Sequence, residues 1–284
     1  MKYIISNIQN DKVGYQRLID FYEECQKIGH LELSFYYWFA ANMSAAVGGM
    51  LDLLQQGGVV YSLGDISSGI ENILKKNGFL RHHFNYSETV DNYHTTIPYQ
   101  KLSPYSGEVF NDYVSNQLFE RNEMPLMSQG VKSKMTELIY ELFVNAQLHS
   151  GTEHIYTCGQ FFPYKNKIEF TIVDTGVGFK EKVNRKFNSK LSAEQAIKWA
   201  VQDKNTTKDI TGGIGLAMLK EFTEYNNGKI QIISSDGYYQ FSKGLESTDS
   251  FEGAFPGTII NIQFKTNDNS SYILKKELDI NKIF

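Results

Sequence analysis

The predicted helix over residues 131–150 carries two stripes of opposite character, and it constrains the fold of the rest of the chain. Residues four apart lie on one face of a helix, so Glu137, Glu141, Asn145 and His149 form a polar stripe. Another face carries an apolar stripe, formed by Met135, Leu138, Ile139, Leu142 and Ala146. The apolar face is expected to pack on a core. The polar face is either solvated or one wall of a site, and the other motifs of the chain decide between the two.

Length and composition favour two folded domains. At 284 residues the chain exceeds the usual size of a single domain, and its 41% hydrophobic content is that of a packed protein. A net charge of −4 without a long basic run does not indicate nucleic acid or an anionic membrane as a partner. The sequence contains no apolar run near the ~18 residues of a membrane helix, and its first residues are too polar for a signal peptide. We therefore expect a cytoplasmic protein that does not enter a membrane.

Cysteine and histidine residues give no sign of a metal centre. Cys25 and Cys158 lie far apart without metal-type spacing, and we expect free buried thiols. His82 and His83 fall in a region predicted to be a strand end and linker. Neighbouring side chains of an extended chain point to opposite sides, so this pair is a poor metal site.

Residues 1–94 alternate between predicted strands and helices. Strands are expected at 1–8, 30–38 and 59–63, and helices at 13–28, 44–56 and 66–76. Such alternation is typical of an α/β domain in which helices pack against one sheet.

Part of this region resembles STAS-like domains, the fold of anti-sigma-factor antagonists. The resemblance covers residues 31–84 and depends on a helix that follows a strand, then on Gly-Val-Val-Tyr-Ser-Leu (58–63) and Ile-Glu-Asn-Ile-Leu-Lys-Lys-Asn-Gly-Phe-Leu (70–80). In that family a phosphorylatable Ser opens the helix after the central strand, and Ser44 occupies about that place, although residues 41–43 lack the usual acidic and hydroxyl neighbours. Ser44 is therefore either a helix N-cap or a phosphoacceptor. The aromatic residues 36–38 either pack in the core or form a binding surface.

Residues 95–284 read as a second α/β unit. Strands are expected at 97–102, 154–162, 167–174, 229–234, 238–242 and 256–264, and helices at 106–119, 131–150, 192–202 and 216–225. Pro98 is compatible with an edge position for the first of these strands, because proline has no N–H to donate and is tolerated at a sheet edge.

Glycines follow one of these strands directly, in the segment Asp174-Thr175-Gly176-Val177-Gly178. A carboxylate at a strand end can accept a hydrogen bond from an exocyclic amine, and glycines let the backbone approach a flat ring. The same pattern also fits an ordinary tight turn or a calcium-type loop.

A second glycine segment, Thr211-Gly-Gly213-Ile-Gly215-Leu216, opens a helix. Free amides at a helix start, together with the positive end of the helix dipole, form a phosphate site. The segment lacks the Lys-Ser/Thr ending of a P-loop, and no strand leads into it as in a dinucleotide fingerprint. The long connection over residues 180–211 suits a mobile lid, in which Lys204 and Lys208 are candidates to meet phosphates.

Together these segments resemble the GHKL ATPase family, which includes gyrase-type ATPases, heat-shock-ninety chaperones, histidine kinases, mismatch-repair proteins and anti-sigma-factor serine kinases. The resemblance covers about residues 100–265, and its motifs are Glu141-x-x-x-Asn145, Asp174-x-Gly176-x-Gly178, Gly213-x-Gly215-Leu216 and Gly257-Thr258. It implies the Bergerat fold, a two-layer α/β sandwich in which a mixed sheet carries helices on one face.

The resemblance also implies roles for individual residues. Asn145 would supply an oxygen to Mg²⁺, and Glu141 would be the catalytic base. Asp174 would bind the adenine amino group, with Thr258 acting beside it through a water. Gly176 and Gly178 would admit the ring, and Gly213 and Gly215 would wrap the phosphates. Leu216 of the same motif, and Lys208 of the connecting segment described above, complete the expected ATP-binding residues.

The two resemblances imply a STAS-like α/β domain at residues 1–94 followed by a GHKL ATPase domain at residues 95–284. Such a chain would be an ATP- and ADP-binding regulator with Mg²⁺-dependent ATPase or protein-serine kinase activity and a protein partner. The chain has no helical pair bearing a phosphorylatable histidine, so self-phosphorylation on histidine is not expected. The alternative is a non-catalytic switch, in which ATP closes residues 180–211 and changes homodimerisation or partner binding.

Overall fold

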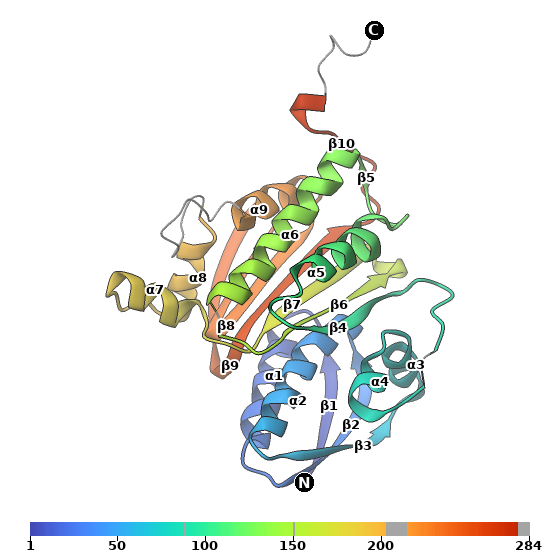
Figure 1. The fold of residues 1–284 in the computed structure, drawn as a ribbon, viewed down its shortest axis with the longest axis vertical. Coiled ribbons are helices and arrows are strands. Elements are labelled where there is room, and N and C mark those ends of the chain that lie inside the picture. The colour runs from blue at the N-terminus through green and yellow to red at the C-terminus, as the bar shows by residue number, and fades with distance from the viewer. Residues whose placement is uncertain (88, 150, 203–214, 278–284) are drawn as a thin grey trace.

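The computed structural model describes residues 1–87, 89–149, 151–202 and 215–277. Two sheets and the helices packed on them form the mixed α/β architecture that the sequence predicts (Figure 1). Within the described residues, no helix combines the length and apolar character needed to cross a bilayer.

The N-terminal layer, residues 1–84, contains a three-stranded sheet in the order β1-β2-β3 with all strands parallel. Its strands are β1 (Lys2–Ile8), β2 (His30–Phe39) and β3 (Val60–Ile66), and its helices are α1 (Lys12–Cys25), α2 (Ser44–Gln56), α3 (Ser68–Lys76) and α4 (Phe79–Phe84). Helix α1 begins where the Asp11 carboxylate accepts a hydrogen bond from the Gly14 amide at 2.8 Å. The predicted alternation of strands and helices is confirmed here.

The second sheet has five strands in the order β4-β6-β7-β9-β8. Its strands are β4 (Thr96–Leu102), β6 (Ile155–Phe162), β7 (Lys167–Asp174), β8 (Lys229–Ser242) and β9 (Leu245–Lys265). Pro98 lies on the edge strand β4, as predicted. The expectation of a mixed sheet is wrong, because all four strand pairings in this sheet are antiparallel.

Helices cover one face of the five-stranded sheet. They are α5 (Gly107–Val114), which continues as a π-helical turn over Ser115–Phe119, α6 (Gln129–His149) and α9 (Gly215–Tyr225) (Figure 1). The predicted apolar stripe of α6 is buried in this core together with Ile168, Phe170 and Ile172 of β7. A short parallel pair, β5 (Leu126–Met127) and β10 (Ser271–Tyr272), lies near the start of α6.

The opposite face of the sheet is covered by the N-terminal layer, so the molecule has more layers than the sequence indicated. Val173 of β7 and Ile259 of β9 belong to the same core as the buried residues of α1 and α2. Helix α1 also holds β9 by hydrogen bonds: the Glu252 amide donates to Oε1 of Gln16 at 3.0 Å, and the Ala254 amide donates to Oε1 of Glu23 at 3.0 Å. Helices α7 (Phe179–Phe187) and α8 (Ala193–Ala200) lie beside β8, at the opposite edge of the sheet from β4 (Figure 1).

Several local predictions differ from the structure. His82 and His83 lie in helix α4, where we predicted a strand end and linker, because Phe79 and Leu80 are fully buried and draw this segment into a helical turn. Ser44 is the first residue of α2 and not its N-cap, and its buried hydroxyl accepts a hydrogen bond from Nδ2 of the Asn77 side chain at 3.0 Å. Tyr37 is 80% exposed, so core packing is the wrong interpretation for this residue.

Candidate functional site

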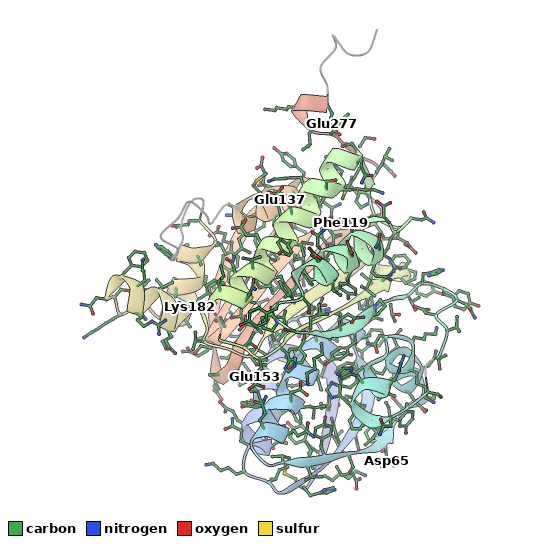
Figure 2. All side chains as sticks on the ribbon, in the orientation of Figure 1. Asp65, Phe119, Glu137, Glu153, Lys182 and Glu277 are labelled. Carbon is green, nitrogen blue, oxygen red and sulfur yellow. The ribbon has the colours of Figure 1, made fainter. Side chains whose placement is uncertain are left out.

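Helix α6 presents the two predicted phosphate-end residues on one face. Glu141 and Asn145 are half-buried and lie one turn apart. Glu137, one turn earlier, is exposed and paired with Lys134 at 3.0 Å (Figure 2). The polar stripe therefore passes from solvent at Glu137 to partial burial at Glu141 and Asn145. The side chain of His149 is not part of the described structure.

The predicted base-binding end of the site is assembled from three neighbouring strands. Asp174 of β7 pairs in register with Thr258 of β9, and Thr258 pairs with Ser234 of β8. Side chains alternate along a strand, and Ile172 and Ile260, two residues away, belong to the core under α6. Asp174 and Thr258 therefore lie on the face of the sheet that α6 covers.

The Asp174 carboxyl group is buried and polar neighbours surround it. Its Oδ1 accepts a hydrogen bond from the Gly176 amide at 3.0 Å, and Thr258 supplies a hydroxyl. Burial raises the pKa of Asp174 to about 6, against the opposing effects of Lys182 on α7 and of these two hydrogen bonds. Lys182 is itself buried enough to lower the pKa of its ammonium group to about 8 (Figure 2). Asp174 is thus ionised at neutral pH but close to its titration range.

Ser234 is a site residue that the sequence analysis missed. Its hydroxyl lies 3.2 Å from the Thr258 hydroxyl and accepts a hydrogen bond from the Phe179 amide at 3.0 Å. It thereby ties the start of α7 to the strand that carries Thr258. The signal available in the sequence was a Ser at the end of an apolar strand, which is common in ordinary turns.

Three glycines make close approaches where a side chain would collide. A Cβ on Gly178 would lie 2.3 Å from Oγ of Ser234, and a Cβ on Gly215 would lie 2.5 Å from Oε2 of Glu141. Gly257 has φ = +146°, and a Cβ there would lie 2.0 Å from the carbonyl oxygen of Asp174. Gly178 and Gly257 thus close the base end around Asp174, and Gly215 brings the first turn of α9 against Glu141.

A cavity of about 600 Å³ borders the loop over residues 174–178, hereafter the 174–178 loop. Gly176, Gly178 and Gly257 line it together with Lys180 and Asn184 of α7. Gly176 and Gly178 are the predicted site residues that it includes.

Part of the predicted site falls on residues that the structure does not describe. Lys204, Lys208 and Gly213 lie in the segment 203–214, which is outside the described residues. Leu216 is described, and its side chain is buried in the core under α6, so only its backbone remains for contact with a ligand. The described part of the predicted lid, residues 180–202, contains α7, which we did not predict, and α8, whose predicted start at Ser192 is confirmed by a capping box with Gln195.

The described residues contain no cluster of three or more His, Cys, Asp or Glu side chains able to hold a metal ion alone. Cys25 and Cys158 are free and buried, as predicted. Burial raises the pKa of Cys158 to about 12, which keeps this thiol protonated and unreactive. His83 is half-buried, and its ring nitrogens lie 2.9 Å from the Tyr99 hydroxyl and 3.1 Å from the Tyr61 hydroxyl. The two thiols and this histidine are therefore interpreted as structural residues.

Comparison with known proteins identifies the second half of the chain. Residues 130–266 match the family model described as histidine kinase-, DNA gyrase B-, and HSP90-like ATPase. The whole chain has no significant match among curated proteins. The matched segment starts at α6, so the STAS-like resemblance of residues 31–84 stays a prediction. It runs from α6 through β7 and α9 to the end of β9, and therefore contains every motif described above: residues 130–266 are an ATP-binding domain of the histidine kinase, DNA gyrase B and HSP90 (GHKL) ATPase family.

Proposed function

We propose that the protein is a Mg²⁺-dependent regulator that either hydrolyses ATP or transfers its γ-phosphoryl group to a serine of a protein partner. The observation that supports the proposal is that the buried Asp174 carboxyl group lies on the sheet face covered by α6, the helix that carries Glu141 and Asn145. A purine contact and two oxygen-bearing side chains for the phosphate end thus belong to one side of one domain. The proposed division into residues 1–94 and 95–284 places the site wholly in the second part.

At the base end, the ionised Asp174 accepts a hydrogen bond from the exocyclic amino group of adenine. Thr258, directly opposite on β9, contributes its hydroxyl through a water. The absence of a side chain at Gly176 and Gly178 lets the ring approach the backbone of the loop. Replacement of adenine by guanine would place a carbonyl oxygen against the carboxylate, so the site favours adenine.

The residues of the phosphate end fit a magnesium ion that is shared with a nucleotide. Mg²⁺ prefers oxygen ligands and is usually held by one or two side chains together with substrate phosphates, which agrees with the lack of a protein-only metal cluster in the described chain. Asn145 would provide the side-chain oxygen. Gly215 has no Cβ, which allows the first turn of α9 to lie against Glu141. Backbone amides at this start of α9 can face phosphate oxygens. When bound, the metal ion would neutralise negative charge that develops on the phosphates.

Glu141 is the proposed base, one turn before Asn145 on the same face of α6. Its carboxylate would orient and deprotonate the attacking water or the serine hydroxyl of a partner. Phosphoryl transfer depends mainly on positioning and on charge stabilisation, so the rigid helix that carries both residues contributes by fixing their spacing.

Calorimetric titration with ATP tests the base end. Wild type is expected to bind ATP in the presence of MgCl₂ and to bind it more weakly with EDTA. Asp174→Asn should abolish detectable binding, whereas the control Asp65→Asn, on the far side of the N-terminal layer, should bind like wild type (Figure 2). Equal affinities for wild type and Asp174→Asn would refute the site.

Turnover separates catalysis from the rival function. Glu141→Gln should retain ATP binding but lose phosphate release or transfer, by about 10²-fold or more for removal of a general base. Glu137→Gln is the matched control, one turn earlier on the same helix. If wild type binds ATP but shows no turnover alone or with any partner, the chain is instead a switch whose ATP-dependent closure of residues 180–211 changes homodimerisation or partner binding.

A further inference from the structure

Helix α2 of the N-terminal layer approaches the five-stranded sheet closely at two consecutive glycines. A Cβ on Gly48 would lie 2.2 Å from the hydroxyl of Tyr99 on β4. A Cβ on Gly49 would lie 2.9 Å from Cγ2 of Thr175 and 3.3 Å from the ring of Tyr156 on β6. Glycine in a helix interior costs about 0.5–1 kcal/mol relative to alanine, so this pair marks a place where the helix must come close.

Polar contacts one turn further along α2 fix this approach. Asp52 accepts a hydrogen bond from the Tyr156 hydroxyl at 2.6 Å and forms an ion pair with Lys101 at 2.7 Å. Gln56 donates to Glu153 at 2.9 Å, at the start of β6. Asp52 is 7% exposed, so its two contacts act in a buried environment where breaking either one is costly. Helix α2 is therefore attached firmly to the sheet beside Gly49.

Thr175, the residue that Gly49 meets, belongs to the 174–178 loop and directly follows Asp174. Its hydroxyl lies 3.0 Å from the Thr152 hydroxyl, and its amide donates to the same oxygen at 3.2 Å. On another side lies Gly257, where a Cβ would come within 2.8 Å of the Thr175 Cα. Thr175 is thus held between α2, Thr152 and β9. A shift of α2 would therefore displace the backbone of the 174–178 loop, which carries the Asp174 carboxylate and the two glycines.

We propose that α2 positions the 174–178 loop through the contact between Gly49 and Thr175, so that the N-terminal layer sets the affinity of the ATP site. Gly49 and Thr175 are positioning residues in this proposal, because neither is assigned a contact with ATP. The coupling is reciprocal: ATP bound at Asp174 holds the loop and thereby stabilises the docked position of α2. This inference rests on the proposed function for its ATP-dependent part. Its structural part, control of the loop by α2, does not need a nucleotide.

Paired substitutions test the contact. Gly49→Ala adds a methyl group against Thr175, and we expect ATP affinity to fall by about tenfold, within the range of measured coupling between sites. Gly69→Ala, in helix α3 of the same layer, is the control, since a Cβ there meets nothing within 4 Å. Thr175→Ser removes the obstructing Cγ2 but keeps the hydroxyl that faces Thr152. The double variant Gly49→Ala/Thr175→Ser should therefore recover most of the wild-type affinity.

Hydrogen exchange of the nucleotide-free protein gives a second readout. The amides of residues 175–178 should exchange faster in Gly49→Ala than in Gly69→Ala, and Thr175→Ser should reverse the increase. Thr175→Val gives a readout that does not depend on the folding of Gly49→Ala: it replaces the hydroxyl bonded to Thr152 by a methyl group and should loosen the same amides.

The outcomes separate the inference from the proposed function. If wild type binds ATP and Asp174→Asn does not, while Gly49→Ala matches Gly69→Ala in both affinity and loop exchange, the positioning role is refuted and the ATP site stands. If loop exchange responds to Gly49→Ala and is rescued by Thr175→Ser but wild type binds no ATP, the proposed function is refuted and control of the loop by α2 stands. A loss of affinity in Gly49→Ala without rescue by Thr175→Ser would also contradict the proposed contact.

Discussion

Asp174 and Thr258 lie directly opposite each other on the adjacent strands β7 and β9, and both side chains are buried. The pairing places a carboxyl group and a hydroxyl group side by side at the end of an otherwise apolar sheet face. A buried carboxylate costs stability in the absence of a ligand, and this cost gives the first prediction its sign.

Asp174→Asn is expected to stabilise the nucleotide-free protein above pH 6. Burial raises the folded-state pKa of Asp174 to about 6 from 3.8, so ionisation opposes folding increasingly between pH 4 and 6 and by a constant amount above that. The shift corresponds to roughly 3 kcal/mol at pH 8, which the neutral amide would recover, and to no gain below about pH 4. Urea denaturation at both pH values measures it. A stability gain that is the same at pH 4 and pH 8 would contradict the assignment.

Lys182→Met is expected to move the acid limit of ATP binding to higher pH. In the proposed site the ionised form of Asp174 accepts a hydrogen bond from the adenine amino group, so affinity should fall as the pH drops through about 6. Lys182 lowers the pKa of Asp174, and its removal lets burial raise this pKa further. Titrations with ATP between pH 5 and 8 give the midpoint. The control is Lys180→Met, on the same helix as Lys182. This change removes only the ion pair of Lys180 with Asp236 on β8 and should leave the midpoint unchanged.

Gly215→Ala should separate turnover from stability. The atoms that a new methyl group would meet belong to the flexible Glu141 side chain, so we expect the carboxylate to turn away and the free energy of unfolding to change by less than about 1 kcal/mol. A displaced base should lower phosphate release by about tenfold or more. Turnover assays and urea denaturation on the same samples measure the two effects. Unchanged turnover would show that the position of Glu141 does not limit the reaction.

Gly257→Ala should be strongly destabilising, because two separate costs combine there. The backbone has φ = +146°, and the methyl group would collide with the carbonyl oxygen of Asp174, which is fixed in the strand pairing. Gly58→Ala is the matched control, with φ = +91° and nothing within 4 Å of a new Cβ. We expect a loss of about 1–2 kcal/mol for Gly58→Ala and about 3 kcal/mol or more for Gly257→Ala. Thermal denaturation should rank the two variants in this order.

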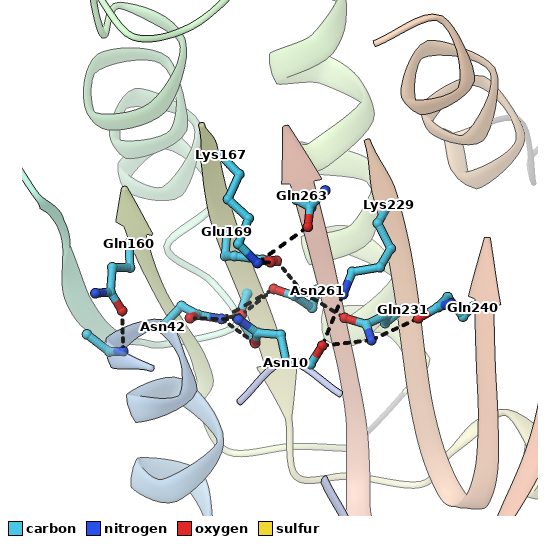
Figure 3. A network of polar contacts seen from close by, with 12 residues as sticks. Asn10, Asn42, Gln160, Lys167, Glu169, Lys229, Gln231, Gln240, Asn261 and Gln263 are labelled. Carbon is cyan, nitrogen blue, oxygen red and sulfur yellow. Dashed lines mark hydrogen bonds and ion pairs between the residues drawn. The ribbon is translucent and has the colours of Figure 1, made fainter. Parts of the chain in front are cut away.

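Asn261→Leu tests the polar network between the N-terminal layer and the sheet (Figure 3). The Asn261 amide group donates to Glu169 at 2.7 Å and to Gln231 at 3.1 Å, and its oxygen accepts from Thr171 at 2.9 Å. Glu169 is fully buried, so removal of this donor should cost about 2–4 kcal/mol. Chemical denaturation checks the loss against the exposed control Asn92→Leu. A loss below 1 kcal/mol would mean that the remaining partners satisfy Glu169.

The motifs of the ATPase half could be predicted from sequence because they are local. The polar and apolar stripes of α6 are four-residue repeats, and Asp174 and its glycines directly follow an alternating strand. Their assembly could not be derived from spacing, because the register that sets Asp174 beside Thr258 and Ser234 joins segments far apart in the chain. The resemblance to a known family supplied that step.

The second covered face of the sheet escaped the sequence analysis for a physical reason. Glu169 and Thr171 alternate with the apolar residues of β7, and polar residues on the second face of a strand normally indicate solvent. In the structure both are buried: Thr171 is bonded to Asn42 and Asn261, and Glu169 accepts a hydrogen bond from Asn261. The first part of β9 was missed for another reason, since residues 246–250 are polar, exposed and without an apolar period.

The hydrogen bonds between α1 and β9 affect how the chain is made. Gln16 and Glu252 are 236 residues apart, so at about 5–20 residues per second the ribosome needs roughly 10–50 s to produce the strand after its helical partner. Throughout that interval α1 has β1 to pack on but lacks its hydrogen-bond partners on β9. Nascent chains stalled before residue 250 should therefore be captured by chaperones and cut by proteases at sites that the finished protein protects.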